Sequence, residues 1–228
     1  KTEVLPVVQR PDGLEYDLTT LVRKLARERR PKIALVTAEL PGSMPVPLDK
    51  LASAWGQLYD VSRVNVAAGE TLAEDLDAVV VLGGTTPYPE AAQRAIDAFV
   101  MGGHAAAFLL APTVPDLKTL QAEPAQHGLG ALVASYGVTI EPGLVLDAEC
   151  ATIQIAQQRG FMQIRQPVRY PFMPLVAQLS ADHPVARGLG QVVFPFTSPL
   201  KVKLAEGSEI EAQVVARSSA QSWIQPAP

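Results

Sequence analysis

The clearest pattern in the chain is a pair of unbroken apolar runs separated by a helix-like segment. The runs, 78–82 and 105–110, are typical of strands buried on both faces of a parallel sheet. Pro89 suits the first turn of a helix between them, and Gly102 with Gly103 suits its end. The pattern therefore predicts a strand–helix–strand crossover with adjacent, parallel strands. Its helix has apolar residues at i, i+3, i+4, i+7 and i+8, on one face: Ala92, Ala95, Ile96, Phe99 and Val100.

Shorter patterns place further elements before this crossover. Hydrophobic periodicity and capping residues separate helices from strands, and proline-rich segments mark the loops. The predicted elements are, in order, an edge strand within 4–8, a helix over 17–29, a strand at 33–36, a helix over 48–58, a strand at 61–66 and one helical turn at 72–76.

The pattern changes after about residue 147. Alternating apolar and polar residues on both sides of 158–160 predict a β-hairpin. The aromatic and proline-rich stretch 169–174 is expected to be irregular. The other elements expected in this half are a helix over 129–136 and strands at 144–146, 192–196, 200–204 and 213–216.

Together these elements predict the α/β class, with a doubly wound, mostly parallel sheet and a β-rich C-terminal elaboration. The α/β core is expected to span residues 1–147. The β-rich extension, residues 148–228, is expected to pack on that core as part of one structural unit.

Composition narrows the functional classes. The chain has 228 residues and a net charge of −4, which gives no reason to expect a nucleic acid partner. A single cysteine, Cys150, excludes an internal disulfide. No apolar run approaches the roughly 18 residues that span a bilayer. The chain opens at Lys1 without a methionine, so we expect a piece of a longer protein whose membrane anchor lies outside this sequence.

The predicted helix over 17–29 ends in a basic segment. Cations in a last helical turn interact favourably with the helix dipole. The segment is open to two interpretations, a surface that docks on a membrane or a partner and a solvated helix end. Its cations are Arg23, Lys24, Arg27, Arg29, Arg30 and Lys32.

Few residues carry recognisable chemistry. The loop after 78–82 contains Gly83 and Gly84 but matches neither nucleotide-binding glycine pattern, and no lysine is placed to reach a phosphate. Cys150 follows two carboxylates, which disfavour a reactive thiolate. The three histidines have no partner at metal-ligand spacing. We therefore predict no catalytic residue, no metal and no cofactor.

A binding site is still expected at one edge of the sheet. Loops that follow parallel strands share the carboxyl edge, where α/β folds bind ligands. Here these loops are 37–47, 83–88 and 111–127. The predicted ligand- or partner-binding residues are Thr37, Glu39, Gly83, Gly84, Thr85, Thr86, Tyr88 and Thr113.

Several short sequence motifs resemble those of one known family. Their order along nearly the whole chain resembles that of the gliding-motility-type auxiliary component of ABC transport systems. Ser218 stands where that family commonly has threonine. The motifs are L-E-Y-D-L-T at 14–19, P-K-I-A at 31–34, A-I-D-A-F-V-M-G-G at 95–103, L-V-L-D at 144–147, D-H-P-V at 182–185, F-P-F-T-S-P-L at 194–200 and the closing serines with tryptophan at 218–223.

The resemblance implies a flavodoxin-like or class I glutamine amidotransferase-like fold on the extracytoplasmic (periplasmic) face of the cell membrane. It implies anchoring in the full-length protein and association with ABC permease and ATPase subunits. Ala111 and Pro112 stand where an amidotransferase would carry its cysteine, so amidotransferase activity is not expected. The predicted function is a non-catalytic accessory or ligand-binding domain. The alternative is a small-molecule hydrolase or transferase with an unrecognised site at the carboxyl edge.

Overall fold

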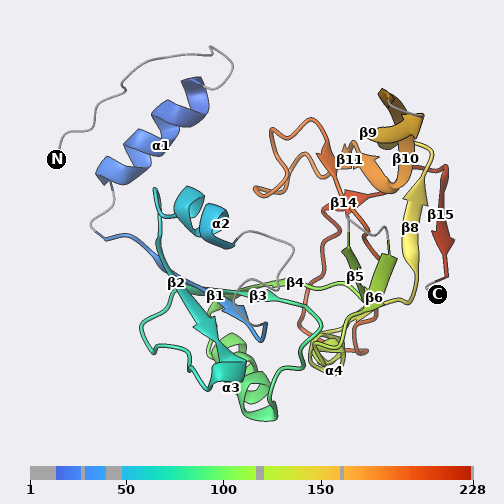
Figure 1. Ribbon diagram of the computed structural model, residues 1–228. Helices are drawn as coiled ribbons and strands as arrows, with labels where there is room; N and C mark the ends of the chain where they lie inside the picture. The colour runs from blue at the N-terminus through green and yellow to red at the C-terminus, as the bar shows by residue number, and fades with distance from the viewer. Residues whose placement is uncertain (1–13, 27–28, 40–47, 117–120, 160–161, 227–228) are drawn as a thin grey trace. The chain divides into compact units, whose positions relative to one another are not determined.

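The chain folds into two compact units. Unit 1 comprises Lys1–Leu110 and Gln126–Gly128, and unit 2 comprises Ala111–Ala125 and Leu129–Pro228. The boundary predicted at Asp147 falls within unit 2. The predicted edge strand within 4–8 lies outside the described residues. The computed structural model (Figure 1) describes residues 14–26, 29–39, 48–116, 121–159 and 162–226.

Unit 1 is built on a parallel sheet of four strands in the order β2-β1-β3-β4. Ala78 pairs with Ala105 and Leu82 with Leu109, so the prediction that the two apolar runs are adjacent and parallel is confirmed. Helices α2 and α3 lie on opposite faces of the sheet (Figure 1). The elements are β1 (Lys32–Thr37), α2 (Leu48–Trp55), β2 (Asp60–Asn65), β3 (Ala78–Leu82), α3 (Glu90–Met101) and β4 (Ala105–Leu109).

The core of unit 1 lies between the sheet and its helices. On the α2 face, Leu35, Val80 and Leu82 form a buried cluster against which Leu51 and Trp55 pack. Alternation along β1 and β3 turns their other buried residues, among them Val36 and Val79, to the opposite face. The predicted helix stripe supplies the fully buried Ile96.

Strand β4 differs from the prediction. Its Ala105, Ala107 and Leu109 are exposed, so burial on both faces is wrong for this strand. The register places them on the same sheet face as Val80 and Leu82, the face that α2 covers. The physical reason is that α2 covers the inner strands and does not extend over β4.

The link between β2 and β3 also differs. A short 3-10 helix, η2 (Val66–Ala68), replaces the helical turn predicted at 72–76, which is not helical. The Asn65 side chain accepts hydrogen bonds from the backbone N of Ala67 and Ala68 and so begins η2. Gly69, with a φ of 82°, ends it.

Helix α1 (Leu14–Ala26) precedes the sheet and begins three residues before the predicted start. Its apolar positions Leu18, Val22 and Leu25 are exposed. Beyond it, Arg29 forms an ion pair with Asp77.

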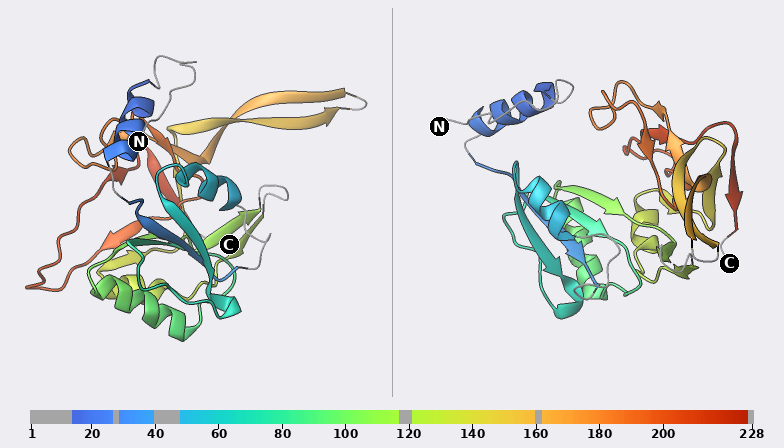
Figure 2. Two further views of the ribbon diagram at one scale, coloured as in Figure 1. Left: turned by 90° about the vertical axis from the view of Figure 1, so that its left-hand side faces the viewer. Right: turned by 45° about the horizontal axis from the view of Figure 1, so that its top comes forward.

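Unit 2 is made mostly of short antiparallel pairs around a long hairpin. The hairpin prediction is confirmed by β9 (Cys150–Arg159) and β10 (Met162–Val176), whose strands run side by side as a ribbon (Figure 2). The stretch predicted as irregular lies within β10, where the register shifts between Arg169 and Pro174. The other elements are the β5–β6 pair (Thr113–Asp116, Gln121–Pro124), α4 (Gly130–Ser135), the β7–β13 pair (Val138–Ile140, Leu200–Val202), the β8–β15 pair (Leu144–Asp147, Ser222–Gln225), the β11–β14 pair (Gln178–Leu179, Ala216–Arg217) and β12 (Val192–Val193).

Candidate functional site

The carboxyl edge of the unit 1 sheet gathers the ends of three strands. Because β1, β2 and β3 are parallel, the residues that follow them meet at this edge. The Asn65 Nδ2 at the end of β2 donates to the backbone oxygen of Glu39 after β1, at 2.9 Å. The Thr37 Oγ1 accepts from the backbone N of Glu39 at 3.0 Å. These bonds fix Glu39 relative to two strand ends.

The Glu39 carboxylate binds the loop after β3. Glu39 is only 7% exposed. Its Oε1 accepts from the backbone N of Thr86 at 2.7 Å, and its Oε2 accepts from the Thr86 hydroxyl at 3.2 Å. The Thr85 hydroxyl lies 3.3 Å from Oε1. A buried carboxylate needs such donors, because burial without them costs several kcal/mol. Glu39 therefore fixes the Thr85–Thr86 turn.

Two glycines let the loop approach so closely. A Cβ on Gly84 would lie 2.1 Å from the Glu39 Oε1, and a Cβ on Gly83 would lie 3.1 Å from the His127 Cδ2. The backbone N of Gly83 donates to the Leu109 oxygen at 2.9 Å, which continues the β3–β4 ladder. Because Gly83 and Gly84 have no side chain, the loop can contact Glu39 and His127.

Tyr88 lies beneath this loop. It is 3% exposed, and its hydroxyl oxygen lies 2.8 Å from the backbone oxygens of both Val36 and Leu82. Burial raises the pKa of the Tyr88 hydroxyl well above its ordinary value, so the hydroxyl remains a proton donor. Tyr88 is one of the predicted binding residues; its buried side chain supports the loop from below, and its binding role stays a prediction.

Thr113 belongs to the other unit. It begins β5 in unit 2, where it is buried and its Oγ1 finds no hydrogen-bond partner among the described residues. The remaining predicted site residues come together in unit 1, where Thr85 and Thr86 are the half-buried side chains above Glu39. Their binding role stays a prediction.

Sequence reasoning missed Asn65, which links the ends of β1 and β2 and begins η2. A signal for it was available: an asparagine that follows an alternating strand and precedes a helical turn is a typical cap. The hydroxyls of Thr85 and Thr86 donate toward Glu39, so their remaining lone pairs can accept hydrogen bonds from a ligand or partner.

The described residues contain no group of three or more His, Cys, Asp or Glu side chains arranged to hold a metal ion. Within the same ranges, no helix has the length and apolar character needed to cross a bilayer. Cys150, at the start of β9, is buried.

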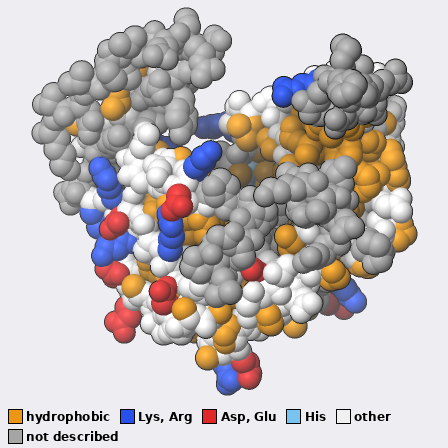
Figure 3. All heavy atoms as spheres, in the orientation of Figure 1, with side chains coloured by type: hydrophobic (Ala, Val, Ile, Leu, Met, Phe, Trp, Pro, Cys, Tyr) orange, Lys and Arg blue, Asp and Glu red, His pale blue; other side chains and the backbone are white. Residues whose placement is uncertain are grey.

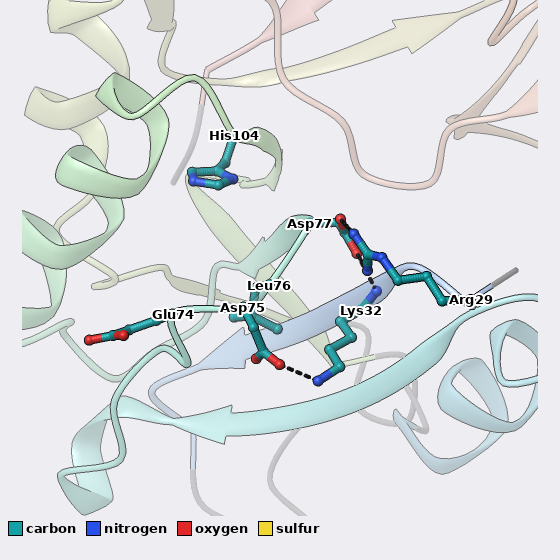
Figure 4. Close-up of a pocket in the computed structure, with 7 residues that line it drawn as sticks. All are labelled: Arg29, Lys32, Glu74, Asp75, Leu76, Asp77 and His104. Carbon is teal, nitrogen blue, oxygen red and sulfur yellow. Dashed lines mark hydrogen bonds and ion pairs between the residues drawn. The ribbon is translucent and has the colours of Figure 1, made fainter.

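The amino edge of the same sheet carries a charged pocket (Figure 4). Arg29 binds Asp77 through two hydrogen bonds of 2.6 and 2.7 Å, and Lys32 pairs with Asp75. The bond from Arg29 lowers the pKa of Asp77 to about 2. His104, at the pocket wall, stacks on Phe99 with ring centroids 4.5 Å apart. The pocket is therefore held by pairing of its own charges.

Comparison with known proteins gives three findings. The family model described as an ABC-type uncharacterized transport system, with an auxiliary role, matches residues 30–228. An uncharacterized protein of Borreliella burgdorferi is 22% identical over 229 residues, which cover 98% of this chain. The chain spans 44% of that relative's length.

The third finding concerns the fold. The solved structure of the mmIFT52 N-terminal domain superposes with a TM-score of 0.55 at 11% identity. The match covers 86% of this chain and 77% of that one. At this identity, the likeness extends to the fold alone.

Proposed function

This chain belongs to the family of auxiliary components described as an ABC-type uncharacterized transport system, and we propose that it is a non-catalytic binding domain of such a system. The proposal places it on the extracytoplasmic face of the membrane, anchored by parts of a longer protein. Its partners are the permease and ATPase subunits, and a small ligand is a second candidate for the same site. A flavodoxin- or amidotransferase-like origin of the fold belongs to this proposal.

The arrangement of Thr85 and Thr86 over the buried Glu39 is the observation that supports it. The turn is fixed before any partner arrives, which reduces the entropy lost on binding. The remaining lone pairs of its two hydroxyls suit a partner that donates hydrogen bonds. The Glu39 carboxylate accepts from the Thr86 backbone N as well as from both hydroxyls, so the contacts at this edge hold the turn in one conformation, which supports a binding role.

The test uses the full-length protein, purified through an affinity tag from membrane extract. Thr85→Val with Thr86→Val removes both hydroxyls and keeps the backbone bond from Thr86 to Glu39. We expect recovery of the permease and ATPase subunits to fall about tenfold, because each lost hydrogen bond contributes about 0.5–1.5 kcal/mol. Thr139→Val with Thr152→Val, at two exposed threonines of unit 2, is the matched control.

Melting temperatures of both double variants separate lost binding from lost stability. Normal recovery of the subunits by the Thr85/Thr86 variant would contradict the carboxyl edge as the binding surface. Turnover of an ester, amide or glycoside panel by the purified wild-type protein, lost in the same variant, would instead support the hydrolase or transferase alternative.

A further inference from the structure

We propose that helix α1 packs in cis on the open face of β4 and completes the cover on the α2 side of the sheet. This open β4 face consists of Ala105, Ala107 and Leu109, which alternate toward one side of the strand. Leu109 is 55% exposed, although Leu82, its register partner on the same face, is buried beneath the α2 cluster. An apolar strand face beside a covered one indicates a missing helix.

Helix α1 carries a surface of the matching kind. Its apolar residues recur at i, i+4, i+7, i+8 and i+11, which forms one stripe along the helix. Val22 in that stripe is 62% exposed. Arg23, which lies on the opposite side of the helix, is exposed as well. The stripe consists of Leu14, Leu18, Leu21, Val22 and Leu25.

The short link from Ala26 to Arg29 brings the end of α1 near the start of β4. Arg29 is bound to Asp77, the residue immediately before β3, and β3 is the neighbour of β4. Ala26, where α1 ends, is three residues from Arg29, and three residues reach at most about 10 Å. The helix would then run from the carboxyl edge to the amino edge, antiparallel to the strands, as crossover helices do.

The spacings of the two surfaces agree. From Leu25 to Leu18 the helix rises about 10 Å, and from Ala105 to Leu109 the strand advances about 13 Å. With α1 antiparallel, Leu25 lies over Ala105, Val22 over Ala107 and Leu18 over Leu109.

The proposal assigns the open β4 face to α1 of the same chain. A short tether holds the two surfaces at millimolar effective concentration, which favours α1 of the same chain over that of a second copy at ordinary protein concentrations.

Disulfide trapping tests the proposal. In a Cys150→Ala background, the pair Val22→Cys and Ala107→Cys should oxidise to an intramolecular disulfide, seen as a faster-migrating monomer on a non-reducing gel. The matched control is Arg23→Cys with Ala107→Cys, which uses the opposite side of the helix. We expect the Val22 pair to form about tenfold faster than the control, because only its stripe faces β4.

Equal rates in the two pairs would overturn the proposal, and disulfide-linked dimers would assign the open β4 face to a second copy instead. Thermal unfolding gives a second readout. Val22→Gln and Leu109→Gln should each lower Tm by about 2–4 °C, and the double variant by no more than either. Met101→Gln, at an exposed residue of α3, should leave Tm unchanged. Unchanged Tm in the Val22 and Leu109 variants would also overturn the proposal.

Discussion

At the scale of single residues, Gly84 is the described glycine of unit 1 at which an added Cβ would come closest to another side chain, that of Glu39. A Cβ at position 84 would lie 2.1 Å from the carboxylate oxygen, which no side chain tolerates. Gly84→Ala should therefore lower the free energy of unfolding by about 1–3 kcal/mol through overpacking. The measurement is urea unfolding followed by circular dichroism.

A double-mutant cycle isolates the cause. In a Glu39→Ala background the carboxylate is gone, so Gly84→Ala should cost at least about 1 kcal/mol less than in the wild type. Gly84 does not have a positive φ, so strain of the backbone does not contribute. An equal cost in both backgrounds would show that Glu39 is not the obstacle.

A second buried carboxylate, Asp147, ties the end of β8 to the C-terminal segment of unit 2. It accepts from the Ser219 hydroxyl at 2.6 Å, the Ser219 backbone N at 2.7 Å and the Glu149 backbone N at 2.9 Å. Burial alone would raise the pKa of Asp147. The three hydrogen bonds together lower it by a larger amount, so the pKa lies below its ordinary value.

That pKa shift predicts a pH dependence of stability. A carboxyl whose folded-state pKa lies below its unfolded value, about 3.9, stabilises the fold above that pH and ceases to do so as the pH falls through the folded-state pKa. Asp147→Asn should cost about 2–3 kcal/mol at pH 7 and progressively less below pH 4. Urea unfolding of both proteins across this range measures the difference. A difference that stays constant to pH 3 would contradict the prediction.

At the scale of elements, the β3–α3–β4 crossover was predictable because its signals agree. Two apolar runs, a helical stripe and two stop glycines all indicate the same unit. The exposure of β4 was not predictable, because an apolar run shows that a strand can be buried and does not show which helix covers it. The one face of β4 left open depends on where α2 ends, which is a property of tertiary packing.

The apolar residues on the stripe of α3 are buried to different degrees. Ile96 is fully buried, whereas Phe99 is half-buried and stacks on His104. Ile96→Ala should lower the free energy of unfolding by about 2–5 kcal/mol, because the cavity beneath the sheet cannot collapse fully. Met101→Ala, at a residue 75% exposed in the same helix, should change it by less than about 0.5 kcal/mol. Comparable costs in the two variants would contradict the packing of α3.

The position of the candidate site was predictable from the sequence, but the directions of its side chains were not. The rule that parallel strands end at one edge placed Glu39, Thr85 and Thr86 together, as found. The same rule says nothing of side-chain direction, so the burial of Tyr88 was missed. It also cannot divide a chain into units, and Thr113 belongs to the other unit.

At the scale of the whole molecule, the two edges of the unit 1 sheet differ in the polar groups that they expose. On the face shown in Figure 3, charged side chains of both signs are interspersed over unit 1. The amino edge carries the exposed pairs Arg29–Asp77 and Lys32–Asp75. At the carboxyl edge, Glu39 and Glu70 accept hydrogen bonds from the chain itself, and the half-buried groups above Glu39 are hydroxyls.

This contrast predicts how the proposed association with membrane partners responds to salt. An interface made by the hydroxyls of Thr85 and Thr86 contains no exposed ion pair, whereas interactions between exposed charges are screened beyond about 3 Å at 1 M salt. Recovery of the permease and ATPase subunits with the full-length protein should therefore change by less than about twofold between 0.1 and 1 M NaCl. Quantitative mass spectrometry of the purified complexes measures this. A tenfold loss at high salt, with Arg29→Ala causing the same loss at low salt, would place the interface at the charged amino edge instead.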